Sequence, residues 1–479
     1  MRIVLLFCGL LIFACGETGM EISGDEQELY QNHLLLKAYF LHPERIKEYE
    51  EYRSMNVDSI YKKVDLMYES LEDYFCGANF VGNCDARYTF YLPPEKTNDK
   101  IDQIQNTKRY YSFGFERRIN KSGDTMIVDA VYPISPAFTA GLRNKDRLLS
   151  ANETPLIGLT GKDSVAYLKN DEPFDSITVF KVLRDGKIET LKPMQKAEVQ
   201  RPTVYLDSIE GIPYIQVTEY KVSTNNTKGG TYAEFKNILR EIKGAKTAIM
   251  DLRGNPGGDI DHCTAMAAEL VPLNNELVYD VRHFRDRKMG NVVVELHEYA
   301  RDYPQREGLG LDIKWVILMN RGSASCSERF TAAVKYNRPE TFVIGQTSYG
   351  KGVGQIYTKT NMGGLAYITC LQTFYPDGTT FHNIGIKPDR PIEIPIELQE
   401  GMPDPAKYPA AYNAYMVAYD AYRATLRNAA IEAARNFGAA AKPLAMSASS
   451  EPLPPERHAD RPEPGAHKRI EFPLFHQGE

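Results

Sequence analysis

The stretch from residue 200 to residue 397 constrains the fold most, because short apolar runs alternate there with segments of helical pattern. Thr247–Leu252 and Lys314–Met319 have the length and composition of buried strands. Apolar residues three and four positions apart predict helices over 229–243, 259–270 and 325–337. Strands that alternate with helices favour one sheet covered by helices, so we predict an α/β core over residues 200–397.

The chain has 479 residues, which is too long for this core alone, so further folded units are expected. Residues 26–95 are rich in Leu, Tyr, Glu and Lys at helical spacing and predict an N-terminal helical domain. Its end is placed at Pro93 and Pro94, because a proline pair disfavours helix. Short β-type runs between turn residues predict a β-rich module over residues 105–196. The expected class is therefore multidomain α+β.

The C-terminal part of the chain is rich in alanine. Spacings of three and four predict one amphipathic helix over residues 404–441, with the stripe Tyr408, Tyr412, Tyr415, Tyr419, Tyr422 and Leu426. Such a stripe packs on the body of the protein or on a second subunit, which leaves a homo-oligomer open. Residues 442–479 are rich in proline, serine and scattered charges, and they predict a disordered tail because they can bury little apolar surface.

The N-terminus, residues 1–15, has the pattern of an export signal. Arg2 precedes an apolar run from Ile3 to Ala14 that is too short to span a bilayer as a mature helix. The run ends at Cys15 in a pattern that resembles a bacterial lipobox, so we expect lipidation at Cys15 and a lipid-anchored protein of the cell envelope, in the periplasm or at the outer membrane. A plain cleaved signal peptide and an uncleaved anchor are the alternatives.

Composition excludes some classes of function. The net charge is -6 without long blocks of one sign, which gives no basis for binding nucleic acid. The seven cysteines form no CxxC pair, and no histidine lies close enough to complete a zinc-type cluster, so neither a metal nor another cofactor is expected. Cys76 and Cys84 are either a short-loop disulfide or two thiols.

Three segments of the core carry residues suited to chemistry. RGSASCSERF, residues 321–330, places serines between an apolar run and a helix, where amide groups and the positive helix end stabilise an oxyanion. Serines at such positions also serve as simple helix caps. SYGKGVGQ, residues 348–355, sets Lys351 between glycines, and a desolvated lysine can act as a general base toward a serine hydroxyl. A solvated loop lysine is the alternative, and the spacing of a phosphate-binding loop is absent.

The third segment, DLRGNPGG at residues 251–258, follows a predicted strand. Its glycines permit sharp turns that direct amide groups at a bound carbonyl, and Gly258 is a candidate donor. All three segments lie at strand-to-loop edges of one predicted domain.

These motifs, in this order, resemble those of the carboxyl-terminal processing peptidases, also called tail-specific proteases. The resemblance covers about residues 28 to 397. It includes DARYTFYLPPE at 85–95, SFGFE at 112–116 and SPAFTAGLRNKDRLLSAN at 135–152, the last two being similar to the PDZ domain of the family. DLRGNPGG, SASCSE, GKGVGQ and GIKPD match its protease core. The resemblance implies a PDZ domain over 105–196 and a crotonase-like Ser-Lys peptidase core over 200–397.

The resemblance also implies roles for individual residues. Ser325 would be the nucleophile and Lys351 its general base, with Gln355 orienting the lysine ammonium. The amides of Gly258 and Cys326 would form the oxyanion hole.

Four further residues take supporting or binding roles by the same resemblance. Glu328 would support the site. The loop amides of Phe113, Gly114 and Phe115 would hold the terminal carboxylate of a peptide substrate. The expected function is therefore a serine endopeptidase that holds substrate tails.

The sequence departs from the family pattern at two core positions. Position 326 is cysteine where the family usually has alanine, which a backbone amide donor tolerates. Gly354 replaces a bulkier residue, so a looser strand is expected there. His262 as a catalytic base and Cys326 as the nucleophile are weaker alternatives, because no carboxylate is clearly placed behind His262. An inactive scaffold that binds peptide tails is the competing function, and a hydrolase of small esters is disfavoured by a peptide-binding module.

Overall fold

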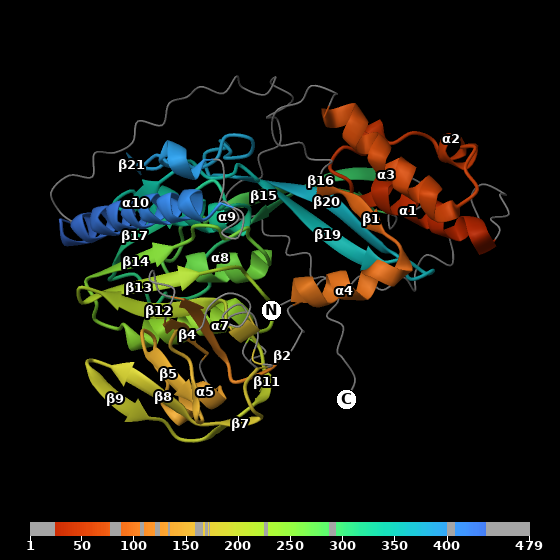
Figure 1. Ribbon diagram of the computed structural model, residues 1–479. Helices are drawn as coiled ribbons and strands as arrows, with labels where there is room; N and C mark the ends of the chain where they lie inside the picture. Colours follow the sequence, from red (N-terminus) through yellow and green to blue (C-terminus); the bar gives the residue numbers. More distant parts are fainter. Residues whose placement is uncertain are drawn as a thin grey trace.

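The computed structural model describes residues 24–76, 88–105, 110–119, 125–132, 135–158, 166–167, 171, 173–224, 229–286, 294–399 and 408–436. Cys15, Cys84 of the considered Cys76–Cys84 pair, and the predicted tail lie outside these residues. The class is mixed α+β, as predicted. In Figure 1 the N-terminal helices and the β-rich part lie at opposite ends of an α/β body.

The α/β body contains a six-stranded sheet. Its strand order is β12-β13-β14-β17-β18-β21, and all neighbours run parallel except β12 and β13. The strands are β12 (Val204–Ile209), β13 (Ile212–Val217), β14 (Thr247–Asp251), β17 (Lys314–Met319), β18 (Phe342–Gly345) and β21 (Arg390–Pro391). Because the carboxyl ends of parallel strands meet at one edge, the loops after β14, β17 and β18 come together.

Helices cover both faces of this sheet. On one face lie α7 (Gly230–Glu241), α8 (Ile260–Ala268) and α9 (Cys326–Asn337), which share a core with residues such as Met250 and Ile317. Their bounds agree with the predicted helices to within two residues. On the other face α10 (Pro409–Arg435) packs against Ile249 and Val316. Adjacent strand residues thus face opposite layers, as the pleat requires.

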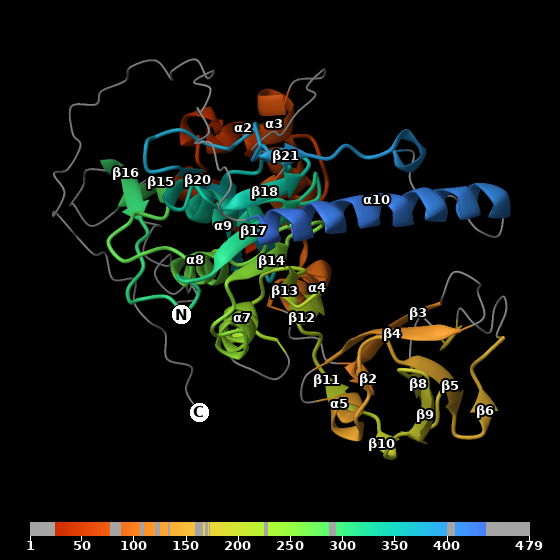
Figure 2. The same cartoon turned by 90° about the vertical axis from the view of Figure 1, so that its left-hand side faces the viewer.

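The predicted stripe is buried only at its C-terminal end, where Tyr422 and Leu426 belong to the core that α10 forms with the sheet. Tyr408 is 61% exposed and Tyr419 is 37% exposed. The buried positions lie in the second half of the helix instead: Leu426, Ala429, Ala430, Ile431 and Ala434. Small residues allow close approach to the sheet there, and Figure 2 shows the first half extending past the sheet.

A second, antiparallel sheet joins the body to the N-terminal helices. It has the order β1-β20-β15-β16, with β19 also paired to β20. The strands are β1 (Phe90–Leu92), β15 (Tyr279–Asp286), β16 (Val294–Arg301), β19 (Val353–Lys359) and β20 (Leu365–Phe374). Helices α1 (Gln27–Tyr39), α2 (Tyr49–Arg53) and α3 (Ile60–Cys76) share one core with Ile368 of β20. The N-terminal helices are therefore packed on β20, which pairs with β19, the strand that follows the Lys351 loop.

The proline pair begins a helix, which corrects the prediction that it marks only a connection. Helix α4 spans Pro94–Gln105 and directly follows β1. Proline is favoured at the first helical position because its missing N–H has no partner there in any case.

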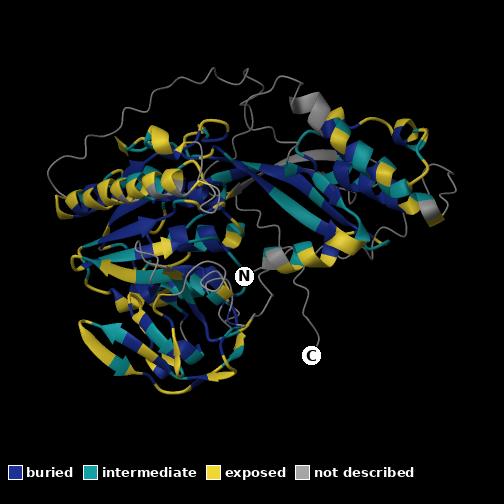
Figure 3. Ribbon diagram, viewed as in Figure 1, coloured by how far each residue is buried: buried dark blue, intermediate teal, exposed yellow. Residues whose placement is uncertain are grey.

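The β-rich part contains a six-stranded sheet of order β3-β4-β5-β8-β9 with β6 paired to β5. These strands are β3 (Phe115–Ile119), β4 (Met126–Val131), β5 (Arg147–Ala151), β6 (Thr154–Pro155), β8 (Phe180–Arg184) and β9 (Lys187–Thr190), and helix α5 is Pro136–Ala140. The remaining pairs are β2 (Tyr110–Ser112) with β11 (Ala197–Val199) and β7 (Ile177–Thr178) with β10 (Met194–Gln195), and the 3-10 helices are Gly24–Glu26, Pro43–Arg45 and Ile396–Leu398. Figure 3 shows buried residues inside each of the three parts.

None of the helices in the described part combines the length and the apolar composition that crossing a membrane requires.

Candidate active site

Ser325 lies at the turn between β17 and α9, where it is the N-cap of the helix. Its φ of 54° belongs to the left-handed region that side chains other than glycine rarely adopt. Its own N–H donates to the Glu328 carboxylate at 2.9 Å. The strained turn therefore holds the serine at the helix N-terminus, where the helix dipole favours negative charge.

Lys351 follows β18 in a loop that the two glycines permit. Its Nζ donates to Oε1 of Gln355 at 2.8 Å and lies 4.6 Å from the ring centre of Tyr88. Desolvation lowers the pKa of the Lys351 ammonium to about 8, although the charge of Glu328 acts in the opposite direction. A substantial neutral fraction at mildly alkaline pH is what a lysine base requires.

Ser325 and Lys351 line one small pocket together with Cys326 and Gly354. The apolar wall of this pocket is formed by Ile260, Val353 and Phe381. The looser strand at Gly354 stays a prediction: the pairing of β19 with β20 shifts register between Gly354 and Gln355, while an added Cβ at Gly354 would lie 2.8 Å from both Ile260 Cδ1 and Leu371 Cδ1. Neighbouring side chains already fill the space of a larger residue.

Glu328 joins the serine turn to the lysine loop. Its buried carboxylate accepts from the amides of Ser325, Gly350 and Lys351 and from the Ser348 hydroxyl. Burial raises the pKa of Glu328, while these donors favour the charged form. One carboxylate thus fixes the separation of the two loops.

The loop Asp251–Gly258 packs directly against the serine turn. An added Cβ at Gly257 would lie 2.7 Å from Ser325 Cβ and 2.9 Å from Cys326 N. Asn255, which the sequence reasoning did not single out although it stands within DLRGNPGG, accepts through its carbonyl oxygen from Ala324 N at 3.0 Å. In the part of the chain that is described, neither Gly258 N–H nor Cys326 N–H has a hydrogen-bond partner. Two unpartnered amides on segments that meet at Ser325 suit an oxyanion.

A disulfide that was not predicted joins Cys326 to Cys263 of α8. The two positions are 63 residues apart in the chain, and no spacing motif connects them. Tyr88 was likewise missed as a neighbour of Lys351, because contact between them depends on the packing of β1 on β20.

His262 is turned toward α7. Its Nδ1 accepts from Tyr232 N at 3.2 Å, and burial lowers its pKa to about 4. Within the described ranges, no group of three or more His, Cys, Asp and Glu side chains gathers so as to hold a metal ion.

In the predicted tail-binding loop, the amides of Phe113 and Gly114 already donate hydrogen bonds within the chain. Phe113 N donates to Oδ2 of Asp171 at 2.8 Å, and Gly114 N donates to Ser112 Oγ at 3.0 Å. Asp171 also forms an ion pair with Arg117 at 2.6 Å. Phe115 begins β3 and pairs with Val131. In this conformation an internal carboxylate occupies part of the site expected for a substrate carboxylate.

Residues 211–392 match the family described as Peptidase family S41. This part of the chain is an S41 peptidase domain. The match contains Gly258, Ser325, Lys351 and Gln355, and it confirms at the family level the resemblance drawn from the motifs.

Curated relatives are similar over a longer stretch than the S41 domain. A protein of Staphylococcus aureus (strain MRSA252) named "Probable CtpA-like serine protease" is 28% identical over 356 residues, 73% of this chain and 64% of the relative. A Staphylococcus epidermidis protein of the same name is 27% identical over 350 residues, 70% of this chain and 66% of the relative. The chain thus spans just under two thirds of their length.

Solved structures are similar at lower sequence identity. The photosystem II D1 C-terminal processing protease has a TM-score of 0.43 and 19% identity, covering 78% of this chain and 95% of that one. Mature CPAF has a TM-score of 0.42 and 14% identity, covering 86% and 98%.

Proposed function

We propose that the protein is a serine endopeptidase that uses Ser325 and Lys351 and holds the C-terminal tails of peptide substrates. The observation that carries the proposal is the pair itself: a serine on a strained turn and a lysine with a pKa of about 8 line the same pocket. An S41 domain that contains both residues supports the same activity.

The proposed mechanism is acyl transfer. Neutral Lys351 takes the proton of the Ser325 hydroxyl, and the serine oxygen attacks the peptide carbonyl. The amides of Gly258 and Cys326 stabilise the oxyanion of the tetrahedral intermediate. The amine product leaves with a proton from Lys351, and water then attacks the acyl-enzyme by the same route.

Gln355 and Glu328 prepare this pair without touching the substrate. Gln355 accepts one N–H of the lysine, which orients Nζ within the pocket. Glu328 holds Ser325 N and Lys351 N on one carboxylate. The residues that react are therefore placed before a substrate binds, which reduces the entropy lost on reaching the transition state.

We propose that the β-rich part is a PDZ domain whose loop Phe113–Phe115 binds a terminal carboxylate once Asp171 is displaced from the Phe113 amide. Lipidation at Cys15 would place the enzyme on a bacterial envelope membrane, where exported proteins with accessible tails are its substrates.

The competing function is a scaffold that binds tails and does not cut. A scaffold has no need for a lysine of lowered pKa beside a serine, so the pocket favours the enzyme.

The test is cleavage of a loosely folded protein with an apolar C-terminal tail by the full chain, by Ser325→Ala and by the matched control Ser208→Ala. Ser208 is exposed in the same domain. We expect cleavage by the parent and the control and none by Ser325→Ala. Tail binding without cleavage by any of the three would favour the scaffold.

A further inference from the structure

The Cys263–Cys326 disulfide lies directly behind the two amides proposed to bind the oxyanion. Cys326 is the first residue of α9 and supplies one of these amides. Gly258, which supplies the other, precedes Asp259, the N-cap of α8, and Cys263 lies in the first half of that helix. The bond therefore joins the two helices that carry the two donors, with the Cα atoms 5.6 Å apart.

The contact between these segments leaves little freedom for displacement. An added Cβ at Gly257 would come within 2.9 Å of both Ala324 O and Cys326 N. Asn255 O accepts from Ala324 N and from Ser327 Oγ, each at 3.0 Å. A small shift of Cys326 against the Gly257–Gly258 loop would thus change the geometry in which the two amides meet an oxyanion.

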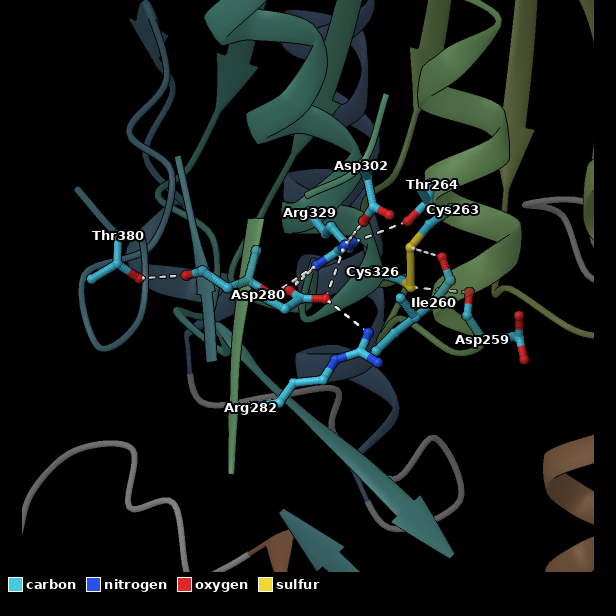
Figure 4. Close-up of polar contacts among 11 residues, drawn as sticks. Asp259, Ile260, Cys263, Thr264, Asp280, Arg282, Asp302, Cys326, Arg329 and Thr380 are labelled. Atoms are coloured by element: carbon cyan, nitrogen blue, oxygen red, sulfur yellow. Dashed lines mark hydrogen bonds and ion pairs between the residues drawn. A yellow bond between two sulfur atoms is a disulfide. The ribbon is translucent and has the colours of Figure 1, made fainter. Parts of the chain in front are cut away.

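A second connection between α8 and α9 lies one helical turn further on and does not involve sulfur. Arg329 donates through Nε to Thr264 Oγ1 at 3.0 Å, and its other four N–H groups bind Asp280, Thr373 and Asp302. Figure 4 shows this buried cluster beside the disulfide. Because all five donors of the guanidinium are used, Arg329 anchors α9 independently of the cysteines.

We propose that the Cys263–Cys326 disulfide is a positioning element of the oxyanion hole, so that peptide hydrolysis depends on this bond being formed. The inference rests on the proposed Ser-Lys function. Unbonded thiols cannot approach as closely as bonded sulfurs, so opening the bond moves Cys326 N relative to Gly258 N. The Arg329 cluster holds α9 one turn beyond Cys326, so the shift is confined to the start of the helix, and the loss falls on transition-state stabilisation and not on folding.

A dithiol reductant opens the bond by thiol–disulfide exchange. The dithiol transfers two electrons and two protons to the disulfide, Cys263 and Cys326 become thiols, and the dithiol becomes a cyclic disulfide. Both cysteines are buried and Cys326 lines the small pocket beside Ser325, so removal of both side chains by substitution is measured beside reduction.

The experiment compares kcat and KM of the full chain before and after treatment with dithiothreitol, in a Cys76→Ser/Cys84→Ser background. Mass spectrometry of alkylated peptides reports the state of Cys263 and Cys326, and circular dichroism reports folding. We expect kcat to fall by about 10-fold or more, since losing one oxyanion donor lowers kcat by roughly 10²–10³-fold. KM should change by less than about twofold, and reoxidation should restore kcat.

The variant Cys263→Ala/Cys326→Ala removes the bond without leaving thiols and keeps the Cys326 backbone amide. Its kcat should lie below that of the oxidised parent, because α8 and α9 are then no longer joined at this point, and it should not respond to dithiothreitol. Cys370→Ala is the control, because Cys370 is a buried free thiol in the same domain.

An unchanged kcat in enzyme whose Cys263 and Cys326 are both alkylated would overturn the proposal. A fall in kcat/KM that comes entirely from a higher KM would also overturn it. So would free thiols at both positions before reduction. If the oxidised parent does not cleave, or if Ser325→Ala cleaves equally well, the Ser-Lys assignment itself fails, and the positioning role fails with it.

Discussion

The two sets of backbone amides that the sequence assigns to substrate differ in their state. In the described residues, the amides of Gly258 and Cys326 have no partner, and the chain around them is fixed by Glu328, Asn255 and a disulfide. The amides of Phe113 and Gly114 are both hydrogen-bonded, one of them to a buried carboxylate. The proposed oxyanion-binding amides are therefore free to bind a ligand, whereas the proposed tail-binding amides are hydrogen-bonded within the chain itself.

This difference has a physical reason. An oxyanion exists only during the reaction, so its donors must be placed in advance and held rigidly. A tail carboxylate is a stable ligand that can displace an internal one if the exchange is nearly neutral in free energy. On the proposed function, substrate tails would compete with Asp171 for the Phe113 amide, while the turn at Ser325 would need no rearrangement.

The largest expected effect comes from Lys351→Met, which removes the base and keeps an apolar chain of similar length. We expect kcat/KM to fall by about 10²–10⁴-fold, the range for loss of a general base. In the parent, kcat/KM should rise with pH through about 8, because lowering the pKa of Lys351 makes the neutral base available there. Lys243→Met, at an exposed position of the same domain, is the control. A parent profile that is flat around pH 8 would argue against Lys351 as the base.

Gly257→Ala tests whether the proposed oxyanion hole depends on the close contact of the Gly257 backbone with Ser325 and Cys326. Its Cβ would collide with Ser325 Cβ and Cys326 N, so we expect kcat to fall by roughly 10²–10³-fold, as for a lost oxyanion donor. Gly254→Ala is the matched control, since Gly254 also has a positive φ, +72°, but an added Cβ there meets no atom within 4 Å. Equal losses in both variants would point to backbone strain instead of crowding.

A smaller effect is expected from Glu328→Gln, measured as the pH profile of kcat/KM. Glutamine keeps only one of the two acceptor oxygens that bind the loop amides, and this loss should lower kcat about 10-fold. The midpoint should also move below pH 8, because the Glu328 charge raises the pKa of Lys351 and its removal lowers that pKa further. Glu241→Gln, on the exposed side of α7, should change neither quantity. A midpoint that moves upward would mean that the loop has opened to water.

The smallest effect is expected from Asp171→Asn, measured as the affinity for peptide tails. This variant tests whether Asp171 occupies the proposed tail-binding site. An amide oxygen accepts a hydrogen bond more weakly than a carboxylate, so a peptide carboxylate should bind Phe113 N more tightly, by about 3- to 10-fold. Isothermal titration with free and amidated peptides measures this. Asp175→Asn, whose side chain bonds Asn152, is the control. Unchanged affinity for the free peptide would show that Asp171 does not compete.

Much of the α/β sheet could be predicted from the sequence, because its strands and helices carry strong local patterns. β17 was predicted at its observed bounds, and α7, α8 and α9 were predicted to within two residues. The antiparallel sheet was not predicted, since the pairs β1–β20 and β15–β20 that assemble it join segments far apart in the chain, and no local pattern announces them. The helix at Pro94 was missed because a proline that starts a helix looks locally like one that ends it.

The sequence by itself determined the mixed α+β class, the family of residues 211–392 and the positions of the serine, lysine and glycine motifs, because those signals are local and ordered along the chain. Only the tertiary structure decided what surrounds them. The lowered pKa of Lys351 needs burial, the Cys263–Cys326 bond needs α8 beside α9, and the occupied Phe113 amide needs Asp171 from a segment 58 residues away. Each depends on groups distant in sequence, whose proximity exists only after the sheets have packed.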